Sequence, residues 1–547
     1  MQNNFTLSGN IVDVVAGKIF TGTVEVTGGR VSKVTPCTVK ETQYILPGLI
    51  DAHVHIESSM LVPAEFARLA VPHGTVATVS DPHEIANVLG IPGIDFMIEN
   101  GRLSPFKFFF GAPSCVPATG FESSGASVDS GQTKNLLERD DIYYLSEMMN
   151  FPGVLFGDEE VHRKLDYAKQ LNKPIDGHAP GLDAENILKY ASSGISTDHE
   201  CTIIDEALLK IEAGMHILIR EGSAARNFDA LIPLMTMHPE KIMFCSDDKH
   251  PDDLVSGHIN LLVRQAIISG YVPIDVIKAC TLNPVRHYNL PCGLLQPGDL
   301  ADIAVVDNLH DFNVLNVYID GNQVAVNGIS LLKSDRYETP NCFVAEKILP
   351  GQLEVPAGNG MIKVIKAFDG DLYTGSMLME PLTVENKVVS DTGRDMLKIT
   401  VINRYRPSRP AIAYIHGFGL KQGAMASTVA HDSHNIICIG TNDDDMIAAI
   451  NSLVEFKGGI SVAEKGQVDL LPLPVAGLMS SEDGYEVARN YEMINKKALQ
   501  LGGNLKAPFM TLSFMALLVI PELKLSDKGL FDGLKFSFTD LFQGTEA

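Results

Sequence analysis

The chain has 547 residues, enough for several domains at about 150 residues each. It carries 43 Lys and Arg against 67 Asp and Glu, a formal net charge of −24. That balance argues against a nucleic-acid or anionic-membrane surface, because phosphate binding needs clustered Lys and Arg. With 45% hydrophobic and 20% charged residues, the composition is typical of a folded soluble protein. We expect a metabolic protein with a small ligand.

The eight cysteines are scattered without a CxxC pair, so neither a zinc ribbon nor a disulfide framework is indicated. The first residues lack the basic and apolar segments of a signal peptide. The apolar run at 507–520 is too short to cross a bilayer. We therefore expect reduced thiols and a cytoplasmic protein that binds neither membrane nor nucleic acid.

Three kinds of sequence texture divide the chain. Short strand-like runs with turns fill residues 1–47 and return at 296–333, and we expect these two segments to pair as a small β-sandwich. Residues 48–295 alternate short apolar runs with helical segments, which predicts a (β/α)8 barrel inserted in that sandwich. Residues 334–547 mix helix and strand patterns and are expected to form a C-terminal α/β domain.

Eight apolar runs within 48–295 end in polar residues, and one helix fits between each successive pair. In a (β/α)8 barrel the active site lies at the carboxyl ends of the strands. The polar side chains that follow the runs are therefore expected to meet in one pocket. The predicted strand ends are His53, Asp81, Ala112, Glu147, His178, His199, Glu221 and Asp247.

His53 and His55 lie one residue apart in LPGLIDAHVHIESS. Side chains alternate along a strand, so both imidazoles point the same way and can bind one ion together. Imidazoles and carboxylates suit divalent zinc, manganese or iron. The sequence therefore predicts a metal site in the barrel, to which further strand ends add Glu147, His178, His199 and Asp247.

The ordered motifs resemble a known family. LPGLIDAHVHIESS and TLNPVRHYNLPCGLLQPGDLADIAVVD are similar to the opening and closing segments of the amidohydrolase superfamily. Together with VSDPHEIANVLG, LSEMMNFPGV, GHAPGL, STDHE, REGSAARN, FCSDDKHPDDL and AHDSHNIICIGTNDDDM, they resemble its adenine deaminases. The resemblance extends into the C-terminal region, which most amidohydrolases lack.

The resemblance implies how the ligands are shared between two metal ions. The first ion would be held by His53, His55 and Asp247. The second would be held by His178 and His199, with Glu147 as the bridge. If Glu147 instead faces away, a single ion is expected. We expect two divalent ions, with manganese ranked before iron and zinc.

The implied reaction is the hydrolysis of adenine to hypoxanthine and ammonia, a step of purine salvage. A metal-bound hydroxide would attack carbon 6, because a metal ion lowers the pKa of its water toward ~7. Asp247 is expected to act as the base that takes the water proton and passes it to the leaving amine.

The ring nitrogen beside carbon 6 must also gain a proton. Mononuclear deaminases of the superfamily use a Glu shortly after the fifth-strand His, but here His178 is followed by Ala-Pro-Gly. Glu84, Glu57 and Glu221 are the remaining candidates. We rank Glu84 first, because His83 beside it can tune its charge or share its proton. Capping of the following helix is the alternative role of Glu84 and Glu57.

Further polar residues are expected around the substrate, namely His83, Glu221, Ser223 and Arg220. Arg220 could instead brace a carboxylate within the barrel. Asp81 is expected to orient a metal-binding imidazole, while Asp248 and His250 fit either role.

The motif HDSHN at 431–435 resembles a second metal site. We favour a loop network that closes over the barrel or braces a subunit contact. The acidic TNDDDM at 441–446 is expected to cap the next helix.

Two other functions remain open. A cyclic amidohydrolase of the dihydroorotase or hydantoinase kind would keep the barrel, but such enzymes usually bridge their metals with a carbamylated Lys at the fourth strand, where this chain has Glu147. A non-catalytic scaffold of the same fold is the other, and the full ligand set argues against it. The expected partners are a small purine substrate and further copies of the chain, in a dimer or larger homo-oligomer.

Overall fold

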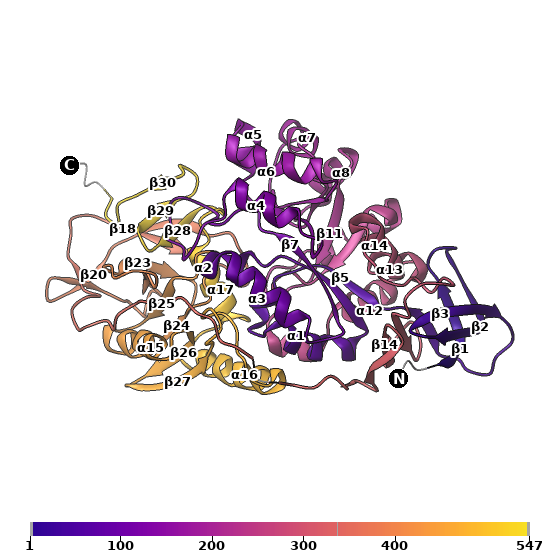
Figure 1. Cartoon of the computed structure of the whole chain (residues 1–547). Helices are drawn as coiled ribbons and strands as arrows, with labels where there is room; N and C mark the ends of the chain where they lie inside the picture. Colours follow the sequence, from indigo (N-terminus) through magenta and orange to yellow (C-terminus); the bar gives the residue numbers. More distant parts are fainter. Residues whose placement is uncertain (1–3, 336, 544–547) are drawn as a thin grey trace.

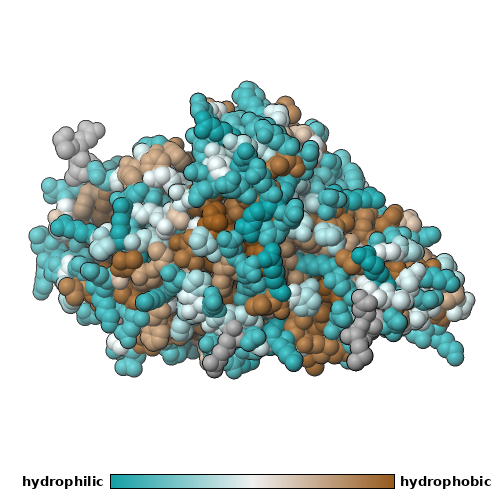
Figure 2. Space-filling view, in the orientation of Figure 1, coloured by the Kyte–Doolittle hydropathy of each residue, from teal (hydrophilic) through white to brown (hydrophobic). Residues whose placement is uncertain are grey.

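The computed structural model describes residues 4–335 and 337–543. Parallel strands form the centre of the molecule, the N-terminal strands lie to one side, and the C-terminal part lies to the other (Figure 1). Hydrophilic residues cover much of the face seen in Figure 2, interrupted by smaller hydrophobic patches. Among the described residues, no helix combines the length and apolar character needed to span a membrane.

The segment before the barrel and the segment after it form one eight-stranded sheet. β4 pairs in parallel with β1 and antiparallel with β13, with Ile45 opposite Val305. The expected pairing of the two segments is thus present, within one sheet; a second layer, as in a sandwich, stays a prediction. Its strands are β1 (Phe5–Asp13), β2 (Lys18–Thr27), β3 (Arg30–Pro36), β4 (Tyr44–Pro47), β13 (Ile303–Val306), β14 (Val314–Ile319), β15 (Asn322–Val326) and β16 (Ile329–Ser330).

The central strands have the arrangement of a TIM-like α/β barrel. β5 to β9 form one parallel sheet, and β10 to β12 form another. The backbone closes the ring between the last strand and the first, since the Asp247 N–H donates to the His53 carbonyl at 3.0 Å. Each strand ends within two residues of its predicted end: β5 (Leu49–Val54), β6 (Thr75–Ser80), β7 (Lys107–Ala112), β8 (Ile142–Met148), β9 (Ile175–Gly177), β10 (Thr197–Asp198), β11 (His216–Arg220) and β12 (Ile242–Cys245).

Most residues of the barrel strands are buried. All six residues of β5 and of β6 are buried, because helices cover the outside of a parallel sheet. The polar Asp51 inside β5 is paired: it accepts hydrogen bonds from the Ser246 N–H at 3.0 Å and from His258, whose Nε2 lies 2.8 Å away. These bonds add a second tie between β5 and the segment after β12.

Helices connect the barrel strands, as the spacing predicts. They are α1 (Pro63–Ala70), α2 (His83–Leu89), α3 (Ile91–Gly101), α4 (Ser130–Leu137), α5 (Phe151–Phe156), α6 (Glu159–Gln170), α7 (Ala184–Ser192), α8 (Ile204–Glu212), α9 (Phe228–Leu231), α10 (Leu234–Met237), α11 (Pro251–Ser256), α12 (Ile259–Ile268), α13 (Pro273–Ala279) and α14 (Leu282–Tyr288).

The C-terminal part is built on a second eight-stranded sheet of mixed direction. In spatial order its strands are β19 (Gly375–Met379), β18 (Ile362–Lys366), β23 (Ala411–His416), β22 (Leu397–Ile402), β25 (Ile436–Gly440), β24 (Ala424–Ser427), β26 (Gly459–Glu464) and β27 (Gln467–Pro472). Smaller sheets contain β17 (Val355–Pro356), β20 (Leu382–Val384), β21 (Lys387–Val389), and β28 (Leu523–Ser526), β29 (Gly529–Asp532), β30 (Ser537–Phe538).

Two long helices and a short one accompany this sheet: α15 (Asp443–Phe456), α16 (Gly484–Gln500) and α17 (Pro508–Ser513), the last followed by the 3-10 turn η4 (Phe514–Ala516). At the start of α15, the Asn442 side chain accepts the Asp445 N–H, and three Asp residues occupy the first turn. Negative charge there complements the helix dipole. The predicted capping role of 441–446 is confirmed.

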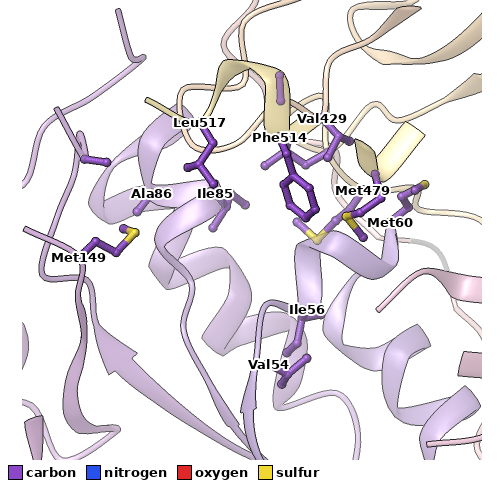
Figure 3. Close-up of a cluster of buried hydrophobic side chains, with 14 of the residues drawn as sticks. Val54, Ile56, Met60, Ile85, Ala86, Met149, Val429, Met479, Phe514 and Leu517 are labelled. Atoms are coloured by element: carbon purple, nitrogen blue, oxygen red, sulfur yellow. The ribbon is translucent and has the colours of Figure 1, made fainter. Parts of the chain in front are cut away.

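Polar and apolar contacts join the C-terminal part to the barrel. Arg68 of α1 forms an ion pair with Asp483 at 2.9 Å, and the Ser480 N–H donates to the Met60 carbonyl at 2.8 Å. Phe514 and Leu517 lie beside α2 of the barrel in the buried cluster of Figure 3. The C-terminal part is therefore packed against the end of the barrel at which the strand termini lie.

Candidate metal centre and substrate pocket

The first predicted group of ligands meets where the barrel closes. His53 lies in β5 and His55 directly follows it, while Asp247 follows β12 with a left-handed φ of 54°. The His53 and His55 Nε2 atoms lie 3.2 Å apart, and each lies near Asp247 Oδ1, at 3.6 and 3.3 Å. All three side chains are buried. The HxH motif thus places two ring nitrogens on one carboxylate oxygen.

The second group lies around Glu147 on β8. Its Oε2 is 2.8 Å from His178 Nδ1 and 3.1 Å from His199 Nε2, while its Oε1 is 3.3 Å from His55 Nε2. Glu147 therefore faces the pocket and lies between the two groups. This is the position that a carboxylate bridging two ions requires.

The donor set suits divalent metal ions. Four imidazoles and two carboxylates converge in buried positions, and groups of three fall within the reach of one ion, including His53, His55 and Asp247. In the part of the chain that the structure describes, the buried His178 Nε2 and His53 Nδ1 have no hydrogen-bond partner. Nitrogen and carboxylate ligands of this kind bind zinc, manganese or iron.

The carboxylates of the centre are held ionised. Burial alone would raise the pKa of Glu147, but the histidines around it, His178 first, lower it well below its usual range. The same opposition acts on Asp247, where burial raises the pKa and the nearby Arg220 guanidinium lowers it more strongly. Both carboxylates are thus negatively charged and available as metal ligands.

Arg220 and Glu200 form a brace next to the metal ligands. The Arg220 guanidinium donates to both oxygens of Glu200 and, at 2.7 Å, to Asp247 Oδ2. Glu200 Oε1 also lies 3.5 Å from His178 Nδ1 and 3.4 Å from His199 Nε2. Arg220 therefore has the bracing contact considered as its alternative role. Glu200 was not among the predicted site residues, although it directly follows His199 in STDHE.

Asp81 orients the histidine next to it. His83 Nδ1 lies 3.0 Å from the Asp81 carboxylate and 3.6 Å from Glu147 Oε1. The Asp81 backbone carbonyl lies 3.3 Å from His55 Nδ1. Such partners fix the ring orientation of an imidazole. His83 lines the pocket together with His55 and Glu147.

Glu84 is held by two histidines of the C-terminal part. Its Oε1 contacts His431 Nδ1 and its Oε2 contacts His434 Nε2. Burial would raise the pKa of Glu84, but His431, His434 and His83 together lower it well below its usual range. The HDSHN motif therefore closes over the barrel within one chain, as the favoured interpretation predicts.

The other two candidate acids lie elsewhere. Glu57 accepts the Ile85 N–H of α2 at 3.1 Å and does not line the pocket. Glu57 therefore caps α2, and not α1, the helix that follows it in the chain and that the alternative role predicted. Glu221 lies outside the pocket lining and 3.8 Å from Arg226, and Ser223 donates to Asp253. The structure thus does not bring Glu57, Glu221 or Ser223 to the metal centre.

The pocket also has an apolar wall that sequence reasoning missed. It consists of Met149 after β8 and of Leu372, Phe514 and Leu517 from the C-terminal part. Figure 3 shows Phe514 and Leu517 projecting from the C-terminal part toward the barrel, with Leu517 above Ala86 and Ile85. No local sequence motif distinguishes these residues from other buried apolar residues. They are identified as pocket residues only by the packing of the C-terminal part against the barrel.

Two family models match the chain. The amidohydrolase family covers residues 44–324, and the adenine deaminase C-terminal domain covers residues 371–537. An adenine deaminase of Salinibacter ruber is 51% identical over 99% of this chain and 100% of its own length. One from Methanosarcina barkeri is 52% identical over 98% and 100%. The chain belongs to the adenine deaminase family.

One further relative and one solved structure are less similar to the chain in sequence. An adenine deaminase of Borreliella burgdorferi is 45% identical over 98% of this chain and 99% of its own length. Among solved structures, the N-acetyl-D-glucosamine-6-phosphate deacetylase of Mycobacterium smegmatis is 15% identical, covers 59% of this chain and all of its own, and has a TM-score of 0.46.

Proposed function

We propose that the protein catalyses the hydrolytic deamination of adenine to hypoxanthine and ammonia. Membership of the adenine deaminase family over nearly the whole chain supports this activity. The observation that carries the chemistry is the position of Glu147, whose two oxygens face His55 on one side and His178 and His199 on the other. A purine base is the proposed substrate, and purine salvage in the cytoplasm is the proposed setting.

Two divalent ions are the proposed cofactors, with manganese ranked before iron and zinc. His53, His55 and Asp247 would hold one, and His178 and His199 the other, with Glu147 shared. Ions bound there would lower the pKa of water and so provide a nucleophile at neutral pH. Imidazole and carboxylate ligands suit all three metals.

Asp247 is the proposed base. It lines the pocket, and its ionised carboxylate can accept a proton as the C–O bond forms at carbon 6. The proton then passes to the amine as the C–N bond breaks. Arg220 acts as a positioning residue, because its hydrogen bond at 2.7 Å fixes Asp247 Oδ2.

The apolar wall supports a flat aromatic substrate. Phe514, Leu517, Leu372 and Met149 can contact the faces of a purine while the polar residues opposite them contact its edge. The wall comes mainly from the C-terminal part, which supports the proposal that 334–547 is a separate domain that completes the pocket.

A cyclic amidohydrolase is the second candidate. The residue on β8 is a glutamate, and the bridging carbamylated Lys usual in those enzymes has no counterpart at position 147. This observation favours the deaminase.

A homo-oligomer is also proposed, and light scattering of the purified protein tests it.

The decisive experiment uses the full chain loaded with manganese. Ammonia release from adenine is measured beside ring opening of dihydroorotate, with metal content determined on the same sample. We expect ammonia from adenine at a rate that falls when the metals are removed by a chelator and returns on reloading. Metal-replete protein that releases no ammonia from adenine would contradict the proposed function.

A further inference from the structure

The two ring nitrogens of His431 have different surroundings. Its Nδ1 contacts Glu84 Oε1, whereas its Nε2 is buried and has no hydrogen-bond partner within residues 4–335 and 337–543. The residue is 3% exposed, and it lines the same pocket as Glu147 and Asp247. A carboxylate on one ring nitrogen fixes the tautomer and leaves the other nitrogen to act on a ligand.

His434, although close in sequence, is engaged on both sides. Its Nε2 contacts Glu84 Oε2, its Nδ1 accepts the Ala430 N–H at 3.2 Å, and it does not line the pocket. Of the two histidines that hold Glu84, His431 is therefore the one that presents a free nitrogen to the pocket.

Glu84 itself is a poor proton donor. Both of its oxygens face imidazoles, and as an ionised carboxylate it carries no proton. It can instead hold a neighbouring imidazole in the protonated form. Burial lowers the pKa of His431, but Glu84 and Asp248 outweigh burial and raise it to about 9.

Resting on the proposed deaminase activity, we propose that His431 is a catalytic residue, which donates a proton from Nε2 to the adenine ring nitrogen next to carbon 6, and that Glu84 positions it. The C-terminal part then supplies a reacting group and not only a wall of the pocket. This assignment replaces the expectation that Glu84 gives the proton directly.

The proton balance closes over one turnover. As water oxygen bonds to carbon 6, the C6–N1 double bond becomes single and N1 takes the proton from His431 Nε2. One water proton passes through Asp247 to the 6-amino group, and the C–N bond breaks to release ammonia. The remaining hydroxyl proton leaves as the C6 carbonyl forms and restores, through water, the proton lost by His431. Hypoxanthine keeps the proton on N1.

Other groups near His431 do not fill this role as well. Glu84, Asp248, Asp432, His434 and His250 are the charged or titratable groups that act on it. Asp248 Oδ1 accepts from Ser58, and His83 Nε2 lies 3.6 Å from both Glu84 and Asp432. His431 Nε2 is the buried ring nitrogen of the pocket's C-terminal side that is left without a partner among the described residues.

The test uses the manganese-loaded full chain and H431N, which removes the acid but keeps a polar side chain. We expect H431N to bind as much manganese as the wild type and to lose at least about 100-fold in kcat, the usual size of a general-acid contribution. The wild-type kcat should fall at alkaline pH, and this fall should be absent in H431N. A kcat within threefold of wild type at equal metal content would overturn the proposal.

Matched variants separate catalysis from folding. H416N changes a partly exposed histidine of β23 that lies outside the pocket, and it should keep wild-type activity. E84Q removes the charge that keeps His431 protonated, so it should lose kcat and shift the alkaline limb to lower pH. If H431N does not fold, E84Q decides: unchanged kcat and an unchanged alkaline limb would overturn the proposal. Failure of the wild type to deaminate adenine would instead contradict the proposed function.

Discussion

Arg220 donates a hydrogen bond of 2.7 Å to Asp247, and this bond links the end of β11 to the residue that closes the barrel. The same guanidinium is bound to both oxygens of Glu200. One cation therefore compensates two buried carboxylates, both of which also lie beside histidines of the metal centre. The candidate metal centre and the closure of the barrel therefore share one ion pair.

Replacing Arg220 by Met should destabilise the protein strongly. It leaves Glu200 and Asp247 buried without their cation, and breaking a buried pair by removing one partner costs about 3–5 kcal/mol. The free energy of unfolding from urea titration of metal-free protein measures the loss. R102M is the control, because Arg102 is 55% exposed and pairs with Glu99 and Asp141 at the surface; its effect should stay below about 1 kcal/mol. Equal losses in both variants would contradict the expectation.

Removing the carboxylate of Glu147 should change the number of bound metal ions. E147A takes away the group that faces both clusters, so we expect fewer than two manganese ions per chain after loading and dialysis, measured by elemental analysis. E200Q is the matched comparison, because Glu200 contacts only His178 and His199 among the proposed ligands. It should keep two. If E147A retains two ions, or if E200Q alone drops to one, Glu147 is not the carboxylate that bridges the two ions.

The sequence could predict the part of the site that lies at strand ends. A period of two on β5 places His53 and His55 together, and parallel strands bring Glu147 and Asp247 to the same end of the barrel. The rule fixes the level of a residue in the barrel but not the direction of the loop that follows. Glu221 shares that level and still points away from the pocket toward Arg226.

Residues from the C-terminal part were beyond such reasoning, for a different reason. Phe514 lies in an apolar run that looks like any buried segment. The buried cluster that gives it a role includes Ile85 of α2, more than 400 positions away. His431 was recognisable as unusual, because HDSHN concentrates titratable residues. Its partner Glu84 was recognised separately, and pairing them required the packing of the two parts.

A pair of histidines, His216 and His287, should make the stability of the protein sensitive to acid. His216 lies at the amino end of its strand, opposite to the end that carries the candidate metal centre. His216 opens β11, and its ring lies 4.5 Å from that of His287 in α14. Burial lowers the pKa of His216 to about 4 and that of His287 to about 3. The unfolded chain binds these protons near the ordinary value of 6.5, so their contribution is intact above that pH and is lost as the pH falls toward 4.

Replacing His287 by Gln should therefore flatten the pH dependence of stability. The melting temperature of metal-free wild type and H287Q is compared at pH 7.5 and at pH 4.5. The decrease between the two should be smaller in H287Q. H310Q is the control, since His310 is 72% exposed, and its decrease should match the wild type. A decrease in H287Q as large as that of the wild type would show that the pair does not titrate as expected.

Lys524 connects two segments of the apolar pocket wall, and its titration should make the stability of the protein depend on pH. Its buried Nζ donates to the carbonyls of Leu372 at 2.6 Å and Phe514 at 2.9 Å, so it joins two segments whose side chains line the pocket. Burial lowers the pKa of this lysine from 10.5 to about 7. Between these values the unfolded chain binds more protons than the folded one, and wild-type stability should rise with pH in that window.

K524M tests both consequences. The wild type should gain stability relative to K524M as the pH rises from 7 to 9.5, because the variant has no side chain at position 524 that titrates there.

K524M should also weaken substrate binding. The buried carbonyls of Leu372 and Phe514 lose their donor, at a cost of about 1–3 kcal/mol for each unsatisfied group, and the two segments are no longer held together by Lys524. We therefore expect a raised KM for adenine with a smaller change in kcat, since no reacting group is removed. K535M, at a site where Lys535 is 74% exposed, should show neither effect. An unchanged KM in K524M would mean that the wall is held by its apolar packing alone.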